Sequence, residues 1–372
     1  MFICVYFLNF AIKLLEKKPS GISRYSKQLI YSLLTFYPDK KFVLFTNSYT
    51  NNDSLQIYRA FPNCEIVSTR IPNKILHASF GVLRFPSLET FAKKCDVYFF
   101  PNVMYLPRLP FASVLTVHDI SYLQLPRAYS FRNHLWYRMV RARSLIGGAR
   151  EVVVDSIATK RAVLQHFPKK KQNISVVYPA LIKPTLPVQR KKSDHLLVLG
   201  DIDERKNIYG ILSAYEQVRS QDNSYKPLLF VGKRGYVNLR ASTLRLFNTL
   251  KRRGWIQERG YVSEKEKWDL LSHAQGLVFV SFYEGFGFPG LEAESLGIPI
   301  IASARTCMPE VFGKGPLYVN PDNIQSIVHA MQLLPTLSTH VSYDNPLVTR
   351  SWEQVASVMM NIFTKVAYEN RN

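Results

Sequence analysis

Residues 281–297 of this 372-residue chain read SFYEGFGFPGLEAESLG, in which GFGFPG spells the pattern G-x-G-x-x-G between an apolar run and a helix-like segment. Such a glycine turn lets the backbone approach a pyrophosphate at a helix N-terminus, as in the dinucleotide-binding βαβ unit. The same stretch carries Glu284 before the glycines and Glu292 after them. It therefore predicts a phosphate-binding strand–turn–helix in an α/β fold, and it leaves open whether the ligand is a dinucleotide.

The chain around this stretch alternates short apolar runs with helix-patterned segments. Apolar runs of the first half lie at 2–7, 42–46, 64–68, 96–100, 112–117, 151–155 and 174–178. After three prolines and a basic run within 178–195, the alternation resumes in HLLVLG, PLLFVG, GLVFVS, IPIIAS and GPLYVN. Such alternation predicts parallel sheets covered by helices on both faces. The proline-rich stretch predicts a linker between two domains that enclose a cleft.

The N-terminus and the cysteines bear on the cellular setting. MFICVYFLNFAIKLL has no basic start and no small-residue cleavage site after it, so we expect a buried strand running into a loop, not an export signal. No run of about 18 apolar residues predicts a transmembrane helix. Cys4, Cys64, Cys95 and Cys307 show no paired spacing. That argues against a disulfide framework or a zinc site and favours a reducing compartment.

The positive charge is concentrated in one half of the chain. The net charge is +21, and residues 1–185 hold 26 Lys and Arg against 9 Asp and Glu, or +17. Such asymmetry favours an anionic partner, for example a membrane surface, a phosphorylated acceptor or nucleic acid. No recognised nucleic-acid-binding motif accompanies the charge, so a basic nucleic-acid-binding protein is retained only as an alternative.

The context of the glycine turn disfavours a nicotinamide enzyme. In those enzymes the turn follows the first strand of its domain, and an acid about 20 residues later holds the ribose. Here the turn follows a late strand, and the next strand IPIIAS is followed by no acid before Glu310. The loop after the first strand of the second half is GDIDERKN, residues 200–207, which has no such fingerprint. An NAD(P)-dependent oxidoreductase therefore stays a minor alternative.

A different ligand follows from the two glutamates. Pro289 favours a helix start, which puts Glu292 in the first turn and Glu284 at the carboxyl edge of the sheet. A carboxylate at such a site can accept hydrogen bonds from ribose or sugar hydroxyls. Arg205 and Lys206, in the loop after another strand, would supply charge against a diphosphate. A nucleotide sugar carries a ribose, a sugar and a diphosphate, and so matches all of these side chains.

Several motifs together resemble retaining GT-B glycosyltransferases of family 4, also called glycosyl transferases group 1. YEGFGFPGLEAESLGIPIIAS with MPEV is similar to the family's signature, whose two glutamates match Glu284 and Glu292. GDIDERKN resembles the phosphate loop, PSGISRY at 19–25 the N-terminal glycine loop, and LTVHDISYLQLP the His-Asp segment. RSWEQVASVMMNIF resembles the closing helix that crosses back to the first domain. These matches cover nearly the whole chain in the expected order.

The resemblance implies a fold of two facing Rossmann-like domains with an interdomain cleft. It assigns 1–185 to an acceptor-side domain, 186–350 to the donor domain, and about 351–372 to a helix packing back on the first. Glu284, His118, Lys206 and Arg205 would be catalytic. The residues implied to bind the donor are Glu292, Gly21, Val262, Gly285, Phe286, Gly287, Phe288, Gly290 and Leu291.

Simpler interpretations accompany several of these residues. His118 could be a hydrogen-bonded strand-end residue without a ligand, and Gly21 only a turn. Glu294 is expected to be a solvated helix residue, and Glu310 a residue at a helix start. Asp201 and Asp203 spell the Asp-x-Asp of metal-binding GT-A enzymes, but they lie beside two cations.

The expectation is a cytoplasmic, metal-independent, retaining mannosyltransferase-like enzyme without a cofactor. Its donor would be a nucleotide sugar, with GDP-mannose as the first choice, and its acceptor a glycan or lipid-linked glycan in surface polysaccharide synthesis. Peripheral contact with the inner, anionic face of the membrane is expected, and contact with nucleic acid is not. Asp201 near a diphosphate is electrostatically unfavourable, so an inactive glycosyltransferase-like partner is a further alternative.

Overall fold

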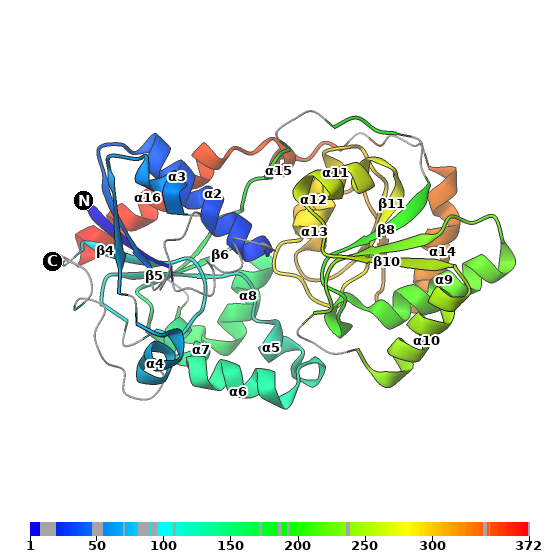
Figure 1. Cartoon of the computed structure of the whole chain (residues 1–372), viewed down its shortest axis with the longest axis horizontal. Helices are drawn as coiled ribbons and strands as arrows, with labels where there is room; N and C mark the ends of the chain where they lie inside the picture. Colours follow the sequence, from blue (N-terminus) through cyan, green and yellow to red (C-terminus); the bar gives the residue numbers. More distant parts are fainter. Residues whose placement is uncertain are drawn as a thin grey trace. The chain divides into compact units, whose positions relative to one another are not determined.

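The structure of the chain is a computed structural model that describes residues 1–7, 20–46, 55–69, 71–80, 90, 95–106, 109–170, 173–184, 188–191, 194–235, 239–337, 341 and 343–370. These residues form two compact units (Figure 1). The first unit comprises Met1–Ile120, Arg132–Ala180 and Arg350–Asn372, and the second comprises Ser121–Phe131 and Leu181–Thr349. The expected boundary at 185/186 falls five residues after this division, and the excursion at Ser121–Phe131 has no counterpart in the expected domains.

The first unit is built on a seven-stranded sheet in the order β3-β2-β1-β4-β5-β6-β7. All of its neighbouring strands run parallel. The strands are β1 (Phe2–Phe7), β2 (Lys41–Thr46), β3 (Cys64–Ser68), β4 (Val97–Phe100), β5 (Ser113–Val117), β6 (Glu151–Val154) and β7 (Ile174–Val176). They coincide with the seven apolar runs to within two residues. Strands β4, β5 and β6 are buried throughout, as expected for inner strands of a parallel sheet, whereas the edge strand β3 is apolar without being fully buried. Residues 8–15 of the N-terminal stretch lie outside the described residues.

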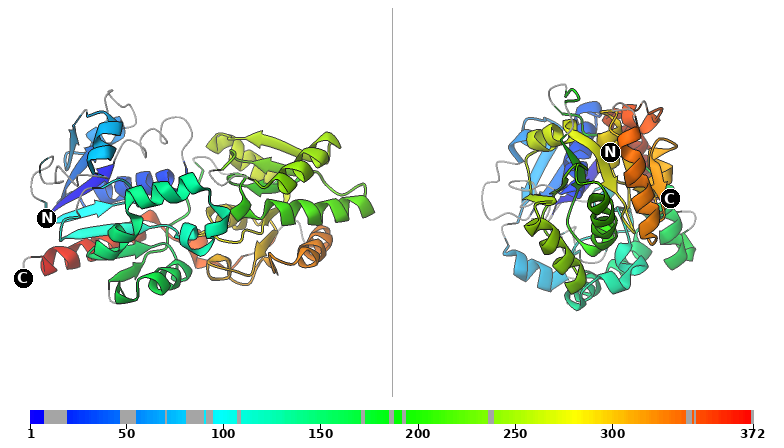
Figure 2. Two further views of the ribbon diagram at one scale, coloured as in Figure 1. Left: turned by 90° about the horizontal axis from the view of Figure 1, so that it is seen from below. Right: turned by 90° about the vertical axis from the view of Figure 1, so that its right-hand side faces the viewer.

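Helices cover both faces of this sheet (Figure 1). They are α2 (Gly21–Phe36), α3 (Gln56–Arg59), α4 (Asn73–Ala78), α6 (Phe131–Val140), α7 (Ala142–Gly148), α8 (Ile157–His166) and α16 (Trp352–Glu369). Helix α16 starts at a capping box made by Ser351 and Gln354, which satisfies backbone donors of its first turn. It packs on α2, β4 and β5 although it ends the chain. The closing helix expected from RSWEQVASVMMNIF therefore belongs to the first unit, together with β1 (Figure 2).

The second unit has a six-stranded parallel sheet in the order β10-β9-β8-β11-β12-β13. Its strands are β8 (His195–Leu199), β9 (Leu228–Val231), β10 (Ile256–Gly260), β11 (Ala274–Phe279), β12 (Ile300–Ser303) and β13 (Leu317–Val319). Five of them match the predicted apolar runs. Strand β10, IQERG, was not predicted, because it is an edge strand with only Ile256 buried and carries Glu258 and Arg259.

The helices of this unit are α5 (Ser121–Gln124), α9 (Ile208–Gln221), α10 (Ala241–Arg252), α11 (Glu264–Ser272), α12 (Phe288–Glu294), α13 (Met308–Phe312), α14 (Ile324–Leu333) and α15 (Pro346–Thr349). Helices α9, α10 and α14 enclose one core, which Tyr215, Phe230 and Phe247 fill at 0% exposure. The sheets and helices confirm the expected GT-B arrangement of two Rossmann-like domains. Among the described residues, no helix has both the length and the apolarity to cross a bilayer.

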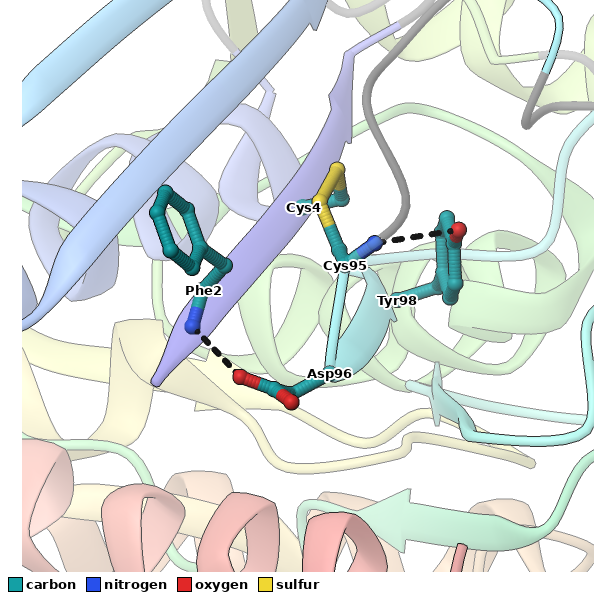
Figure 3. Close-up of a disulfide and its surroundings, with 5 residues drawn as sticks. All are labelled: Phe2, Cys4, Cys95, Asp96 and Tyr98. Carbon is teal, nitrogen blue, oxygen red and sulfur yellow. Dashed lines mark hydrogen bonds between the residues drawn. A yellow bond between two sulfur atoms is a disulfide. The ribbon is translucent and has the colours of Figure 1, made fainter. Parts of the chain in front are cut away.

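The structure corrects the expectation that the cysteines are unpaired. Cys4 of β1 and Cys95, two residues before β4, are joined by a disulfide with their Cα atoms 5.9 Å apart (Figure 3). Strands β1 and β4 are neighbours in the sheet, whereas the two cysteines are 91 residues apart in the chain. Sequence spacing could not reveal the pair for this reason. Cys64 and Cys307 are free thiols.

Candidate functional site

Two loops at the carboxyl edge of the second sheet bring the principal candidates together. Lys206 ends the short 3₁₀ helix η6 (Glu204–Lys206) that follows β8, and Glu284 lies between β11 and α12. Because β8 and β11 are neighbours in the sheet, their following loops share one edge. Ligands of open α/β sheets bind at this edge.

Lys206 and Glu284 form a largely buried ion pair. The Nζ of Lys206 contacts Oε1 of Glu284, and the two side chains are only 14% and 12% exposed. The hydroxyl of Ser281 donates to the same carboxylate oxygen over 2.7 Å. The Lys206 ammonium also lies 4.9 Å from the centre of the Phe279 ring, a favourable cation–π distance. The basic loop and the acidic loop therefore meet at one point, as the sequence pattern implied.

The phosphate-loop candidate GDIDERKN is fixed by its own side chains. Asp203 accepts from the backbone N–H and from the guanidinium of Arg205, each over 3.0 Å. The Arg205 carbonyl accepts from the Phe282 N–H over 2.8 Å, which ties this loop to the loop of Glu284. Asn207 has the left-handed φ of 55° that asparagine tolerates, and its side chain caps α9. Asp203 is thus engaged in structural contacts that a metal ligand would have to give up.

The carboxyl of Asp201 has a raised pKa. Burial raises its pKa above the ordinary value, and the nearby charges of Lys233 and Lys206 only partly offset that shift. Arg205 pairs with Asp203, and its charge also acts to lower the pKa of Asp201. Burial thus disfavours the charged form of Asp201.

The second and third glycines of GFGFPG, Gly287 and Gly290, are explained by backbone conformation and packing. Gly287 has a φ of 97°, and a Cβ on Gly290 would lie 2.1 Å from the Phe312 ring. The Gly290 N–H donates to the Gly287 carbonyl over 3.0 Å. The thiol of Cys307, a residue without an assigned role in the sequence analysis, contacts the carbonyls of Glu284 and Phe286 over 3.3 and 3.2 Å. This turn needs glycine to admit Phe312, and the Gly290 amide already has a backbone acceptor.

Glu292 faces a lysine that the sequence analysis did not single out. Its side chain is 2% exposed, and its Oε1 accepts from Nζ of Lys267 over 2.5 Å. Lys267, on α11, is itself buried and also contacts Glu264 over 2.9 Å. Lys267 lies three residues after Glu264, and this helical spacing could have indicated the Lys267–Glu264 pair. The sequence gives no such sign of the contact between Lys267 and Glu292 of α12.

The expectation that Glu294 is solvated is wrong. It is 4% exposed, and burial raises its pKa to about 8, although a hydrogen bond from Asn345 opposes the shift. The Asn345 amide donates to Glu294 over 2.5 Å and to the Val311 carbonyl over 2.8 Å. Helix α12 is covered on this face by the segment leading to α15, which the sequence pattern of α12 alone could not indicate. Glu310 does lie in the first turn of α13, as expected.

The remaining donor-site candidates of this unit surround the same edge. Gly285 and Phe288 are half-buried, and Phe286 and Leu291 are buried. Val262 is half-buried and lies two residues before α11. The rings of Phe286 and Phe288 make an edge contact at 5.1 Å between centroids.

His118 and Gly21 belong to the first unit. His118 directly follows β5, and its Nδ1 is 2.6 Å from Asp155, which follows β6; its Nε2 is 2.9 Å from the Pro101 carbonyl. Burial would lower the pKa of His118, but Asp155 outweighs it and the pKa is raised. Gly21 is the exposed first residue of α2, which Ser20 caps. Both ring nitrogens of His118 thus have protein partners, and Asp155 is a supporting residue that the sequence analysis missed.

Comparison with known proteins places this site in a family. Residues 187–339, nearly the whole second unit, match the family described as glycosyl transferases group 1. O-antigen chain mannosyltransferase B of Escherichia coli is 31% identical over 251 residues, covering 64% of this chain and 65% of that protein. O-antigen chain mannosyltransferase RfbU of Salmonella typhimurium is 28% identical over 236 residues, covering 63% and 64%. The chain thus aligns with slightly less than two thirds of the length of these relatives.

Solved structures show the same fold over the whole chain. Sucrose-phosphate synthase of Thermosynechococcus elongatus superposes with a TM-score of 0.62 at 17% identity, covering 99% of this chain and 97% of that one. WaaG, a glycosyltransferase involved in lipopolysaccharide biosynthesis, superposes with a TM-score of 0.61 at 13% identity, covering 99% and 98%. The fold is therefore GT-B. The second unit matches the glycosyl transferases group 1 family over residues 187–339, in agreement with the resemblance noted in its motifs.

Proposed function

We propose that this protein is a retaining glycosyltransferase that moves a sugar from a nucleoside-diphosphate sugar to a glycan or lipid-linked acceptor in surface polysaccharide synthesis. GDP-mannose is the proposed donor, because two curated relatives, 31% and 28% identical, are named as O-antigen mannosyltransferases. The proposed setting is cytoplasmic, with peripheral contact to the membrane.

One observation carries the proposal: the ion pair of Lys206 and Glu284 at the carboxyl edge of the second sheet. Nucleotide-sugar transfer needs a cation for the leaving diphosphate and an anion beside the sugar carbon on which positive charge develops. The pair supplies both from two loops that are braced by the Arg205–Phe282 backbone hydrogen bond. Such bracing reduces the reorganisation that the site would otherwise undergo during the reaction.

The proposed mechanism uses no covalent nucleophile. Lys206 and Arg205 stabilise the charge of the departing diphosphate, and Glu284 stabilises the oxocarbenium-like sugar. The acceptor hydroxyl forms the new bond on the face that the diphosphate leaves, and its proton passes to a phosphate oxygen. Glu292 binds the ribose, and the backbone near Val262 lies beside the base. His118 and Gly21 of the first unit are proposed to contact the transferred sugar and the diphosphate.

The three alternatives from the sequence have less support. A nicotinamide enzyme would use the glycines to approach its pyrophosphate, whereas Gly290 is required here by the neighbouring Phe312 ring. A nucleic-acid-binding protein would not require the buried Lys206–Glu284 pair. Direct measurement of GDP-mannose turnover distinguishes an active enzyme from an inactive homologue.

A ligand screen tests the proposal. Thermal unfolding of the full chain should be measured with GDP-mannose, UDP-glucose, GDP, UDP and NAD⁺, since a ligand of the folded state raises the unfolding temperature. We expect GDP-mannose and GDP to raise it, and NAD⁺ to have no effect. Stabilisation by NAD⁺ alone would contradict the proposal. Because side-chain cations take the place of a metal in the proposed site, turnover of GDP-mannose should also survive EDTA. Loss of turnover that only Mn²⁺ or Mg²⁺ restores would overturn the proposed metal independence.

A further inference from the structure

Helix α6 (Phe131–Val140) presents most of its apolar side chains to the solvent, and Val140 is its one fully buried residue. Four of its apolar side chains are exposed, at 80% for Phe131, 44% for Leu135, 37% for Trp136 and 51% for Met139. Asn133, His134 and Tyr137 are partly buried on the opposite side. A surface helix of a globular domain normally shows the reverse arrangement, with its apolar stripe on the core.

These exposed residues form a continuous stripe. Phe131, Leu135 and Met139 follow one another at intervals of four residues, so they lie on the same face of the helix. Trp136 lies beside this stripe and makes edge contacts with Tyr105 and Tyr137, with ring centroids 6.1 and 4.9 Å apart. Three aromatic rings in contact therefore border the stripe on the side of Trp136.

Arginines flank the stripe without acidic neighbours. Between Asp119 and Glu151 the sequence holds six arginines and no aspartate or glutamate. Arg132, Arg138 and Arg143 are exposed. Within the described part of the chain, none of these three forms an ion pair with a carboxylate. Their charge is thus available to an external anionic surface.

We propose that the outer face of α6, made of Phe131, Arg132, Leu135, Trp136, Arg138 and Met139, docks on the surface of an anionic phospholipid bilayer. Bulky apolar side chains interleaved with arginine are typical of helices that lie in the bilayer interface, and tryptophan favours the headgroup level. The absence of acids over 31 residues fits a negatively charged surface. This inference deepens the proposed membrane-proximal setting by naming the surface responsible, but it needs neither donor nor acceptor.

Vesicle flotation of the full chain tests the surface. We expect binding to vesicles of equal parts phosphatidylcholine and phosphatidylglycerol, little binding to phosphatidylcholine alone, and weakening as salt rises through about 0.1–0.5 M. Leu135→Ser/Met139→Ser should lower the partition coefficient at least about tenfold, since two bulky apolar groups are lost. Arg132→Gln/Arg138→Gln should lower it on the anionic vesicles by a similar factor.

Matched controls lie on α10 of the second unit. Leu244 is 41% exposed, and Arg245 and Arg252 are exposed. Leu244→Ser and Arg245→Gln/Arg252→Gln should bind vesicles like the wild type, and all variants should keep the wild-type unfolding temperature. If the α6 variants bind like the controls, or if wild type binds neutral and anionic vesicles equally, the inference is wrong. A dimer in solution that the α6 variants dissociate, with no vesicle binding, would likewise overturn it in favour of a protein interface.

Fluorescence locates the contact within the chain. Phospholipids brominated on their acyl chains quench only tryptophans that enter the bilayer, and we expect partial quenching that the Trp136→Phe variant abolishes. Equal quenching in wild type and Trp136→Phe would place the contact elsewhere and contradict the assignment to α6. Because neither assay contains a sugar nucleotide, failure of the transfer proposal and failure of the docking proposal are distinguishable.

Discussion

At the scale of single residues, Glu292 and Glu294 lie two positions apart on α12 and point to different faces, yet both are buried. Glu292 accepts from the ammonium of Lys267, whereas Glu294 accepts from the neutral amide of Asn345. The two carboxyls therefore differ in what burial does to them. An ionised carboxylate is tolerated inside a protein when it is paired, and it otherwise takes up a proton.

This contrast predicts a pH-dependent stability that comes from Glu294. Its pKa is raised from 4.5 to about 8 in the folded protein. Between these two values the folded state holds a proton that the unfolded state has lost, so this residue lowers stability as the pH rises from about 4.5 to about 8. Replacing it by glutamine, Glu294→Gln, should remove that slope, a gain on the order of a few kcal/mol at pH 8.5 relative to pH 5. Denaturant unfolding at both pH values checks this; equal changes in wild type and variant would contradict it.

The Lys267–Glu292 pair predicts a coupled effect. Lys267→Met leaves Glu292 buried without this cation, which should cost about 3–5 kcal/mol of stability and raise the donor KM. The double variant Lys267→Met/Glu292→Gln should recover much of the stability and none of the donor affinity. Lys265→Met, at an exposed position of the same helix, is the control and should behave like wild type. Full donor affinity in the double variant would show that Glu292 does not bind the ribose.

At the scale of elements, the turn before α12 depends on how closely α13 approaches it. A Cβ at Gly290 would overlap the Phe312 ring, so Gly290→Ala should lower stability by about 1–3 kcal/mol. Adding Phe312→Leu to Gly290→Ala should restore part of the lost stability, because the smaller side chain makes room for the alanine Cβ. Gly147→Ala on α7, where a Cβ meets nothing within 4 Å, is the control and should not lower the unfolding temperature. Failure of Phe312→Leu to rescue Gly290→Ala in thermal unfolding would reject this account of the glycine.

The strands and turns also differ in how well the sequence predicts them. The strands buried on both faces were located to within one or two residues, because burial makes them apolar throughout. Strand β10 was missed because an edge strand has one solvated face and carries charges such as Glu258. The turn before α12 was found from its glycines, but their purpose was not, since the contact with Phe312 joins positions 22 residues apart.

At the scale of the whole molecule, the order of motifs along the chain predicted two parallel-sheet units and the return of α16 to the first. It also predicted that the loops of Lys206 and Glu284 share one edge, because strand ends define that edge whatever the loop sequence. Contacts that depend on side-chain packing between distant segments were not predictable. Lys267 with Glu292, Asn345 with Glu294, and Cys4 with Cys95 are of this kind.

The most direct test of the central claim is the steady-state kinetics of GDP-mannose turnover by Glu284→Gln and Glu292→Gln, beside the exposed control Glu266→Gln. Glu284 is proposed to act where charge develops, so its variant should lose about 10²–10³ in kcat with little change in donor KM. Glu292 is proposed to hold the ribose equally in ground and transition states, so its variant should mainly raise the donor KM. A folded Glu284→Gln variant with wild-type kcat would contradict the assignment of the Lys206–Glu284 pair as the reaction centre.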